Sequence, residues 1–319
     1  MKLGTLIDDG IQKVVVRVDD ETAAVVNYPN MEVLIQEGDR GLDRAHAARE
    51  DVLSGKRAAM NLTGANWLAP NPLCSKILGV AGNNPPFNEK LFRPMISPVF
   101  FLKVRSSLLG DGEAIVLRPR YGVVLPEPEV VAVFSRAAKN VSEDRILDHI
   151  FGYTITNDVT SRGIRESEDS FSWADAKPGA GTKTAEWRKK LGEDDIYQHA
   201  TYHCRSKATD TFAPIGRWIT TKDEIPDPNN LVIRGFVDGM KYCEGNHGEN
   251  LFSVQRILSE ASEWFTMEPG DCVHFGPPSR RQLNYPDGTT EVILNRHRST
   301  AVEVDGLGRL ENRIHIEDQ

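Results

Sequence analysis

The chain has few cysteines, no long apolar run and no concentrated positive charge. Its four cysteines, Cys74, Cys204, Cys243 and Cys272, are widely spaced and include no CxxC pair. This argues against structural zinc and against a disulfide framework. No stretch of about 18 apolar residues occurs, and the first ten residues lack the apolar core of a signal peptide. These absences predict a soluble, cytoplasmic protein with reduced thiols and no membrane partner.

Other protein classes are excluded by charge and by motifs that are missing. The 319 residues include 38 basic and 46 acidic side chains, a net charge of −8, and no extended basic cluster. No nucleic-acid partner is therefore expected. No GxGxxG follows a predicted strand and no Walker loop occurs, so nucleotide binding has no support. What is present is an ordinary globular composition, 39% hydrophobic and 26% charged.

The pattern along the chain predicts a small N-terminal domain, residues 1–70, followed by a larger domain, residues 71–319. Residues 14–18 and 23–26 are typical of a β-hairpin, and residues 30–54 have apolar positions at helical spacing. The polar, Pro-rich segment 68–73 indicates a linker. The small domain is therefore expected to be of the α/β type.

The larger domain is expected to be rich in β-strands. Apolar, β-branched runs predict strands at residues 77–80, 99–104, 114–117, 129–134, 231–237, 271–275 and 299–304. Helices are expected only at 142–150 and 251–262. Many strands with long connections and few helices favour an α+β, β-rich mixed fold over a doubly wound sheet.

A polar insert, residues 163–206, interrupts this pattern. It contains the aromatic and imidazole side chains of Trp173, Trp187, Tyr197, His199, Tyr202 and His203. A loop of this length is usually functional or partly mobile. Whether it covers a site or only decorates the surface stays open.

The first chemical signal is a pair of carboxylates at a strand start. Glu127 and Glu129 flank Pro128 just before an apolar strand. Residues two apart on a strand point to the same face, and two like charges there repel unless a cation joins them. A pair of solvated acids on an edge strand explains the same pattern equally well.

A third carboxylate follows the strand-like segment 152–157. Asp158 could complete an all-oxygen site, which suits Mg²⁺, Mn²⁺ or Ca²⁺. Taken by itself, Asp158 is better explained as a helix N-cap before Ser161 and Arg162 than as a metal ligand. Two further segments carry chemistry: Lys207 among small and polar residues, suited to stabilising an oxyanion, and the turn–strand–loop of residues 269–278.

Taken in order, these segments resemble the fumarylacetoacetate hydrolase family over about residues 77–314. The segments that carry the resemblance are 125–129, 152–162, 207–216, 269–278 and 306–312, with Lys103 and Ser106 fitting a further family pattern. Thr160 stands where the family has Ser, and residues 274–277 depart from its usual sequence. Segment 125–129 is closer to the dehydratase branch, and segment 207–214 to the hydrolase branch.

The resemblance implies a β-roll catalytic domain, a homodimer, and one Mg²⁺ or Mn²⁺ ion (Ca²⁺ as third candidate) held by Glu127, Glu129 and Asp158. It also implies a small anionic keto acid as substrate and a role in catabolism. The first hypothesis is C–C hydrolysis of a diketo or acylpyruvate-type acid through a metal-bound enolate. Substrate contacts are expected at Lys103, Ser106, Arg162, Asn246, His247, Gly276 and Pro277.

One departure leaves the reaction class open. Phe87 and Lys90 stand where hydrolases of the family carry a His–Glu pair that activates water. One candidate replacement is Glu89, which lies one position away. The others are histidines, because imidazole titrates near neutral pH: His199, His203, His247 and His274. We expect Lys207, His203 and Glu89 to be catalytic. The alternatives are a lyase, dehydrating a 2-keto-3-deoxy sugar acid or decarboxylating an oxaloacetate-like acid, and an inactive metal-binding homodimer.

Overall fold

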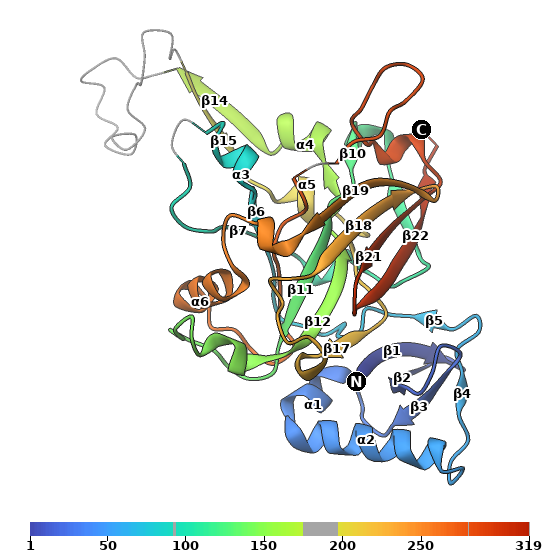
Figure 1. Ribbon diagram of the computed structural model, residues 1–319. Coiled ribbons are helices and arrows are strands. Elements are labelled where there is room, and N and C mark those ends of the chain that lie inside the picture. Colours follow the sequence, from blue (N-terminus) through green and yellow to red (C-terminus); the bar gives the residue numbers. More distant parts are fainter. Residues whose placement is uncertain (92–93, 175–196, 280, 319) are drawn as a thin grey trace.

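The computed structural model describes residues 1–91, 94–174, 197–279 and 281–318. Strands dominate and helices are few, as predicted (Figure 1). An eleven-stranded sheet forms the centre. Its strands, in spatial order, are β4 (Met60–Asn61), β3 (Thr22–Val26), β2 (Ile11–Arg17), β1 (Lys2–Asp8), β17 (Ile219–Thr221), β12 (Ile150–Asn157), β11 (Pro128–Phe134), β20 (Cys272–His274), β6 (Ile77–Ala81) and β7 (Val99–Lys103), with β5 (Asn66–Trp67) paired to β1.

A second, five-stranded sheet lies beside the central strands (Figure 1). Its order is β19 (Met240–Asn246), β18 (Val232–Val237), β21 (Ser299–Val304), β22 (Gly308–Ile316) and β9 (Ala114–Leu117). Three two-stranded pairs complete the described strands: β10 (Val124–Leu125) with β13 (Thr160–Ser161), β14 (Ser170–Ala174) with β15 (Tyr197–Thr201), and β16 (Ala213–Pro214) with β8 (Leu108–Leu109).

The described α-helices are α1 (Met31–Gln36), α2 (Asp39–Leu53), α3 (Pro85–Asn88), α4 (Arg162–Glu166), α5 (Arg205–Ala208) and α6 (Val254–Trp264). None of them is long and apolar enough to cross a membrane. In α6, Ser253 caps the first turn by accepting from the backbone N–H of Arg256. The predicted helix 251–262 is thus confirmed, with its start moved to Val254.

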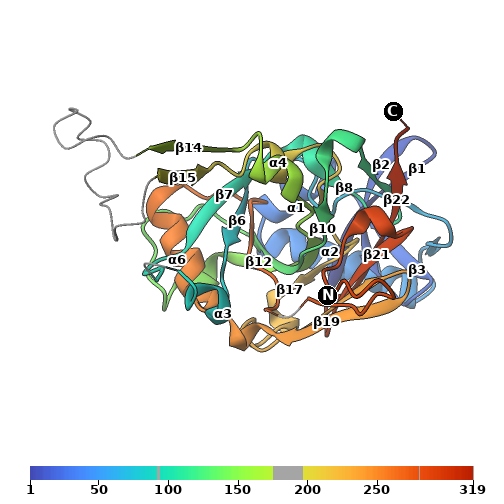
Figure 2. The same ribbon diagram turned by 90° about the horizontal axis from the view of Figure 1, so that it is seen from above.

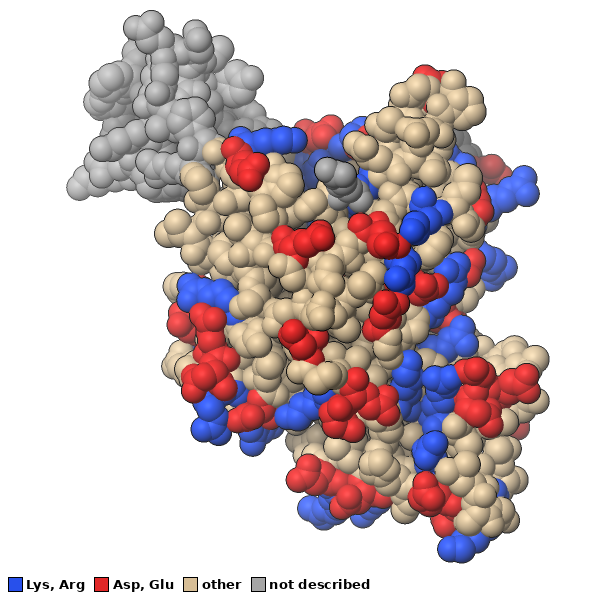
Figure 3. All heavy atoms as spheres, viewed as in Figure 1, with Lys and Arg blue, Asp and Glu red and all other residues tan. Residues whose placement is uncertain are grey.

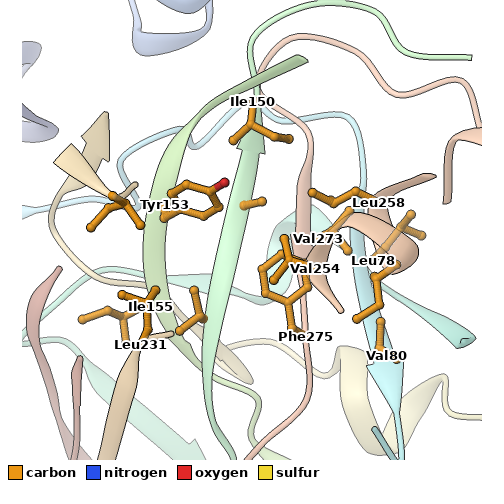
Figure 4. Close-up of a cluster of buried hydrophobic side chains, with 14 of the residues drawn as sticks. Leu78, Val80, Ile150, Tyr153, Ile155, Leu231, Val254, Leu258, Val273 and Phe275 are labelled. Atoms are coloured by element: carbon orange, nitrogen blue, oxygen red, sulfur yellow. The ribbon is translucent and has the colours of Figure 1, made fainter. Parts of the chain in front are cut away.

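The main core lies between α6 and the two sheets. Val254 and Leu258 of α6 pack beside Leu78 and Val273 of the central sheet, all at most 2% exposed (Figure 4). Burying each such side chain contributes about 1.5–3 kcal/mol relative to leaving it in water. This core holds β6, β11, β12 and β20 in a fixed order.

The N-terminal hairpin and helices are confirmed, and the same sheet continues into the strands of the larger predicted domain. β1 pairs with β17, and α1 and α2 share a core with Val131 and Phe151 of β11 and β12. The expected linker is held in place as well, since Nδ2 of Asn71 donates to the carbonyl oxygen of Gly270 at 2.6 Å. The division at residue 70 stays a prediction.

The helix predicted at 142–150 is wrong. Only a 3-10 turn, Ile146–His149, forms there. Ile150 already pairs with Phe134, so the sheet takes the residues that a longer helix would need. Long-range pairing outweighs local helical spacing at this point.

The polar insert is not one long loop. It begins with α4, continues into the antiparallel pair β14–β15, and ends with α5. This pair extends away from the rest of the fold in both views (Figures 1 and 2). Trp187 lies outside the described residues, as do the side chains of Trp173, Tyr197 and His199.

Candidate metal centre

Five neighbouring strands of the central sheet and one short helix position a group of buried carboxylates. The strands are β12, β11, β20, β6 and β7, and the helix is α5. Glu127 and Glu129 lie at the start of β11, and Asp158 directly follows β12. The strands are in register so that Pro128 faces Asn157, and the backbone N–H of Asp158 donates to the carbonyl oxygen of Glu127 at 2.7 Å. The three carboxylates therefore meet because two adjacent strands end together.

All three carboxylates are buried, with relative exposures of 8% for Glu127, 1% for Glu129 and 0% for Asp158. Solvated acids on an edge strand are thereby excluded. Asp158 is not a helix cap either, because the side chain of Ser161 caps α4 by accepting from the backbone N–H of Ile164. Buried carboxylates need a compensating cation.

Lys207, on α5, supplies one such cation. Its Nζ lies 2.5 Å from Oε2 of Glu127 and 2.5 Å from Oδ2 of Asp158, and 4.8 Å from the centre of the Phe101 ring. Burial alone would lower the pKa of Lys207, but the carboxylates of Asp158 and Glu127 outweigh it and raise the pKa above its ordinary value. Lys207 is therefore held as a cation at the centre.

Lys103 and Arg281 contact the same carboxylates. Nζ of Lys103 donates to Oδ1 of Asp158, and the guanidinium of Arg281 donates to Oε1 of Glu127 at 2.9 Å. Burial lowers the pKa of Lys103, and Asp158 only partly offsets this. Lys103 was expected to bind substrate, which stays a prediction; in the structure its Nζ contacts Asp158, a predicted metal ligand.

These cations set the charge of the carboxylates. Burial raises the pKa of Asp158, but Lys103 and Lys207 outweigh it and hold the pKa well below its usual range. At Glu127 burial is likewise outweighed, by Lys207 and Arg281, and the pKa falls to about 2. Both side chains are thus anionic, the form that a metal requires.

Glu129 is held by a different pair of donors. Its Oε2 accepts from the backbone N–H of Gly276 at 2.7 Å and lies 2.6 Å from Nδ1 of His274. Burial raises the pKa of Glu129, and His274 only partly offsets this. One ligand atom each from Glu129, Asp158 and His274 lie within 4.8 Å of one another, which makes them a group able to hold a metal ion.

The donor set therefore fits a divalent metal. It offers carboxylate oxygens and one imidazole, all deeply buried. Glu127 is linked to this group because Nζ of Lys207 contacts both Glu127 and Asp158. Its role as a third carboxylate ligand stays a prediction.

The remaining expected site residues divide into near and distant ones. His203 is half-buried, with its ring centre 6.0 Å from that of Phe101. Glu89, in contrast, is exposed at the end of α3, and no described contact joins it to the centre. Ser106 is exposed and donates to Oδ1 of Asp210 at 2.9 Å, whereas Arg162 pairs with Glu291 at 2.6 Å.

The described contacts of Asn246 and His247 are with residues other than the carboxylates and Lys207. The Asn246 side chain bonds to Asn230 and caps a 3-10 turn at Gly248. The buried His247 ring lies 5.5 Å from that of Phe275, and its Nδ1 contacts the carbonyl oxygen of Pro228. Gly276 does reach the centre, through its N–H, and Pro277 is buried beside it.

Sequence reasoning missed Arg281 and Phe101 and did not foresee the contact of His274 with Glu129. Arg281 lies 154 positions from Glu127 in a loop with no motif, so no local signal marks it. His274 carried one signal, since it lies in the segment that departs from the family pattern.

On the face shown in Figure 3, acidic and basic side chains are interspersed.

Comparisons with known proteins identify the family of the chain. Residues 78–185 and 193–315 match the family model described as fumarylacetoacetate (FAA) hydrolase C-terminal. A bifunctional isomerase/decarboxylase of 4-hydroxyphenylacetate degradation from Escherichia coli is 31% identical over 72% of this chain. The aligned residues span 44% of that relative's length. An uncharacterized protein from Pyrococcus abyssi is 31% identical over 76% of this chain and 92% of its own.

Solved structures share the fold over nearly the whole chain. Fumarylacetoacetate hydrolase from Exiguobacterium antarcticum has a TM-score of 0.72 at 21% identity, covering 99% of this chain and 100% of its own. Maleylpyruvate hydrolase from Sphingobium sp. SYK-6, in complex with manganese(II) and pyruvate, has a TM-score of 0.70 at 21% identity and covers 100% of both chains. On the family match and these relatives, the chain belongs to the fumarylacetoacetate hydrolase family.

Proposed function

We propose that the chain is a metal-dependent enzyme that breaks the C3–C4 bond of a small 2-oxo acid, so that the electron pair left on C3 is stabilised as an enolate by the C2 keto group. The observation that carries this proposal is the meeting of two buried carboxylates, Glu127 and Asp158, with the buried Nζ of Lys207. This arrangement suits an enzyme, because a buried cation beside the carboxylates can stabilise negative charge that develops on a bound substrate.

Glu127, Glu129 and Asp158 would hold Mg²⁺, Mn²⁺ or Ca²⁺. When bound, the metal supplies a Lewis acid for the keto oxygen of the substrate. Support for manganese and for a 2-oxo acid comes from the Sphingobium maleylpyruvate hydrolase, whose structure holds manganese(II) and pyruvate.

Lys207 would stabilise the negative charge that develops when the bond breaks. Its ammonium group is buried against Phe101, where water screens its charge little. It is held in place by Glu127 and Asp158 before any substrate arrives, so little reorganisation is needed during the reaction. The same positive charge would attract an anionic substrate.

For hydrolysis, His203 is the base that the geometry favours. Its Nδ1 has no hydrogen-bond partner among the described residues, and the ring lies beside Phe101. Burial, together with Lys207 and Arg165, lowers the pKa of His203, so the ring is neutral and able to accept a proton at pH 7. Glu89 and Phe87 are both exposed, which favours His203 over Glu89.

Decarboxylation is the second candidate. It needs no base to activate water, and Phe87 occupies the position of the usual His. The Escherichia coli relative is described as an isomerase/decarboxylase, which supports the same reaction class. An oxaloacetate-like acid would then lose CO₂ and leave an enolate beside Lys207.

The partner in the assembly would be a second copy of the chain. β7 lies at the end of the central sheet and exposes the apolar side chains of Val99 and Leu102. An exposed apolar edge strand is a surface that soluble proteins usually cover. Light scattering should give the mass of a homodimer, and a monomer at micromolar concentration would contradict this.

A product assay tests the reaction class. The purified protein is incubated with Mn²⁺ and acylpyruvates, oxaloacetate or 2-keto-3-deoxy sugar acids, and products are followed by NMR. Two acid fragments indicate hydrolysis, CO₂ release indicates decarboxylation, and a dehydrated keto acid would point to the lyase alternative. No turnover of any of these acids would contradict the proposed reaction.

The metal assignment has a separate test. Mn²⁺ should raise the thermal midpoint of the wild-type protein because it binds the folded state, and Glu127→Ala should abolish that shift. Glu143→Ala, which removes an exposed carboxylate from an ion pair with Arg256, is the matched control and should keep it. A wild-type protein without any shift would reject the metal centre.

A further inference from the structure

An imidazole faces the carboxylates from a position that the expected ligand set does not include. His274 ends β20 and is 1% exposed, and its Nδ1 lies 2.6 Å from Oε2 of Glu129. Ligand atoms of Glu129, Asp158 and His274 lie within 4.8 Å of one another. Two ligands of one ion are at most about 4.2 Å apart when each bond is about 2.1 Å, so small side-chain adjustments suffice.

The sheet fixes this position from both sides. His274 pairs with Val131 of β11 on one side and with Gly79 of β6 on the other. Val131 is two residues from Glu129, and residues two apart share a face. His274 and Glu129 are thus diagonal neighbours on one face of a central, hydrogen-bonded part of the sheet.

The neighbouring strand leaves room for the ring. A methyl group at Gly79 would lie 2.4 Å from Cε1 and 2.5 Å from Nε2 of His274, and 2.2 Å from Cζ of Phe101. A side chain at position 79 would therefore push both rings away. The ring of His274 therefore occupies space that a side chain at position 79 would fill.

We propose that Nδ1 of His274 is a ligand of the metal, together with Glu129 and Asp158, so that the centre is a mixed oxygen–nitrogen site that favours Mn²⁺ over Mg²⁺. The inference rests on the metal centre proposed above and extends its ligand set. Mg²⁺ is bound through oxygen, whereas an imidazole favours transition-metal ions. Coordination needs the neutral ring with its proton on Nε2, and no electron transfer is involved.

The competing role for His274 is to position a ligand. In that case Nδ1 keeps a proton and donates it to Oε2 of Glu129 in the loaded protein as well. A metal-bound histidine and a hydrogen-bonding histidine are separated by direct detection of the metal–nitrogen bond.

Pulsed electron paramagnetic resonance on the Mn²⁺-loaded wild-type protein provides this detection. We expect modulation from a directly bound ¹⁴N nucleus, replaced by a ¹⁵N signal when the protein is made with [¹⁵N]histidine. The signal should disappear in His274→Leu and persist in His203→Gln, the matched change at a neighbouring imidazole. The labelled wild-type protein gives an answer even when His274→Leu does not fold.

Calorimetry supplies an independent readout. His274→Leu should weaken Mn²⁺ binding by about tenfold or more and Mg²⁺ binding less, so the ratio of the two affinities falls. His203→Gln should leave the ratio unchanged. Mn²⁺ that binds tightly without a nitrogen signal would overturn the role of His274 and leave the proposed centre standing, whereas absent Mn²⁺ binding in the wild type would overturn both.

Discussion

Lys207 and Asp158 meet with Nζ 2.5 Å from Oδ2, although 49 positions separate them along the chain. Lys207 reaches Asp158 from α5, at the end of the polar insert, and Asp158 follows a central strand. The insert therefore delivers a cation to the carboxylates of the sheet. Its last helix is part of the centre and not only a surface decoration.

Replacing Lys207 by Met should lower kcat by about 100-fold or more, because one preorganised charge that stabilises the transition state is lost. The Mn²⁺-induced rise in thermal midpoint should remain, since the metal ligands are intact. Steady-state kinetics and thermal melts measure both effects. Lys241→Met removes a lysine from an exposed ion pair with Glu244 and should change neither. Unaltered kcat in the Lys207 variant would remove this residue from the mechanism.

Gly276→Ala should weaken Mn²⁺ binding. Gly276 has a φ of +89°, and an added methyl group would lie 3.0 Å from Cβ of Asn83. The backbone must shift, and its N–H moves away from Oε2 of Glu129. The strained conformation should also cost about 1–3 kcal/mol of unfolding free energy.

Gly288→Ala is the matched control for this prediction. Gly288 has a similar φ of +80°, with nothing within 4 Å of the added methyl group. It should lose stability to a comparable extent and keep its Mn²⁺ affinity, measured by calorimetry. Equal losses of affinity in both variants would show that Gly276 has no specific role at Glu129.

His247 should make the protein less stable in mild acid. Burial lowers the pKa of His247 to about 4, so the folded state resists a proton that the unfolded state, with an ordinary value near 6.5, accepts. The free energy of unfolding is unaffected by this titration above pH 6.5 and decreases as the pH falls toward 4. The decrease in unfolding free energy reaches about 3 kcal/mol.

Urea unfolding at several pH values between 7 and 4 measures this loss. His247→Gln should flatten the dependence, because the variant has no titrating group at this position. His46→Gln, at an exposed position on α2, should keep the wild-type slope. An unchanged slope in the His247 variant would assign the acid sensitivity to other groups.

Asp169 should stabilise the helix that carries Lys207. Burial raises the pKa of Asp169, but its bonds from the backbone N–H of Ser206, at 2.7 Å, and from Arg205 outweigh this and lower the pKa. Its contribution is present above the ordinary pKa of aspartate and is lost as the pH falls through the lowered value. Asp169→Asn should cost about 1 kcal/mol or more at pH 7.

The same substitution should lower kcat, since Lys207 loses its support. Denaturant unfolding and kinetics at pH 7 check both effects, with Asp144→Asn at an exposed position as the control. Full activity with unchanged stability in the Asp169 variant would contradict the assigned role.

Several elements could be predicted from local pattern alone. The strands β6, β7, β9, β11, β18 and β21 were located within a few residues, because alternating or continuous β-branched residues suit a pleated, buried surface. The alternation of strand side chains also put Glu127 and Glu129 on one face. The prediction of a helix at 142–150 was wrong because Ile150 pairs with Phe134, a contact that no local pattern reveals.

The order of residues along the chain establishes where the negative charge lies, with acids at the start of one strand and at the end of another, within an ordered family pattern. Which cationic and imidazole groups meet these acids depends on how the strands pair in three dimensions. Lys103, Arg281 and His274 reach them from 55, 154 and 145 positions away. Burial is the physical reason, because a carboxylate removed from water must find its partners within a few ångströms, and the pairing of β11, β12, β20, β6 and β7 determines which residues lie that close.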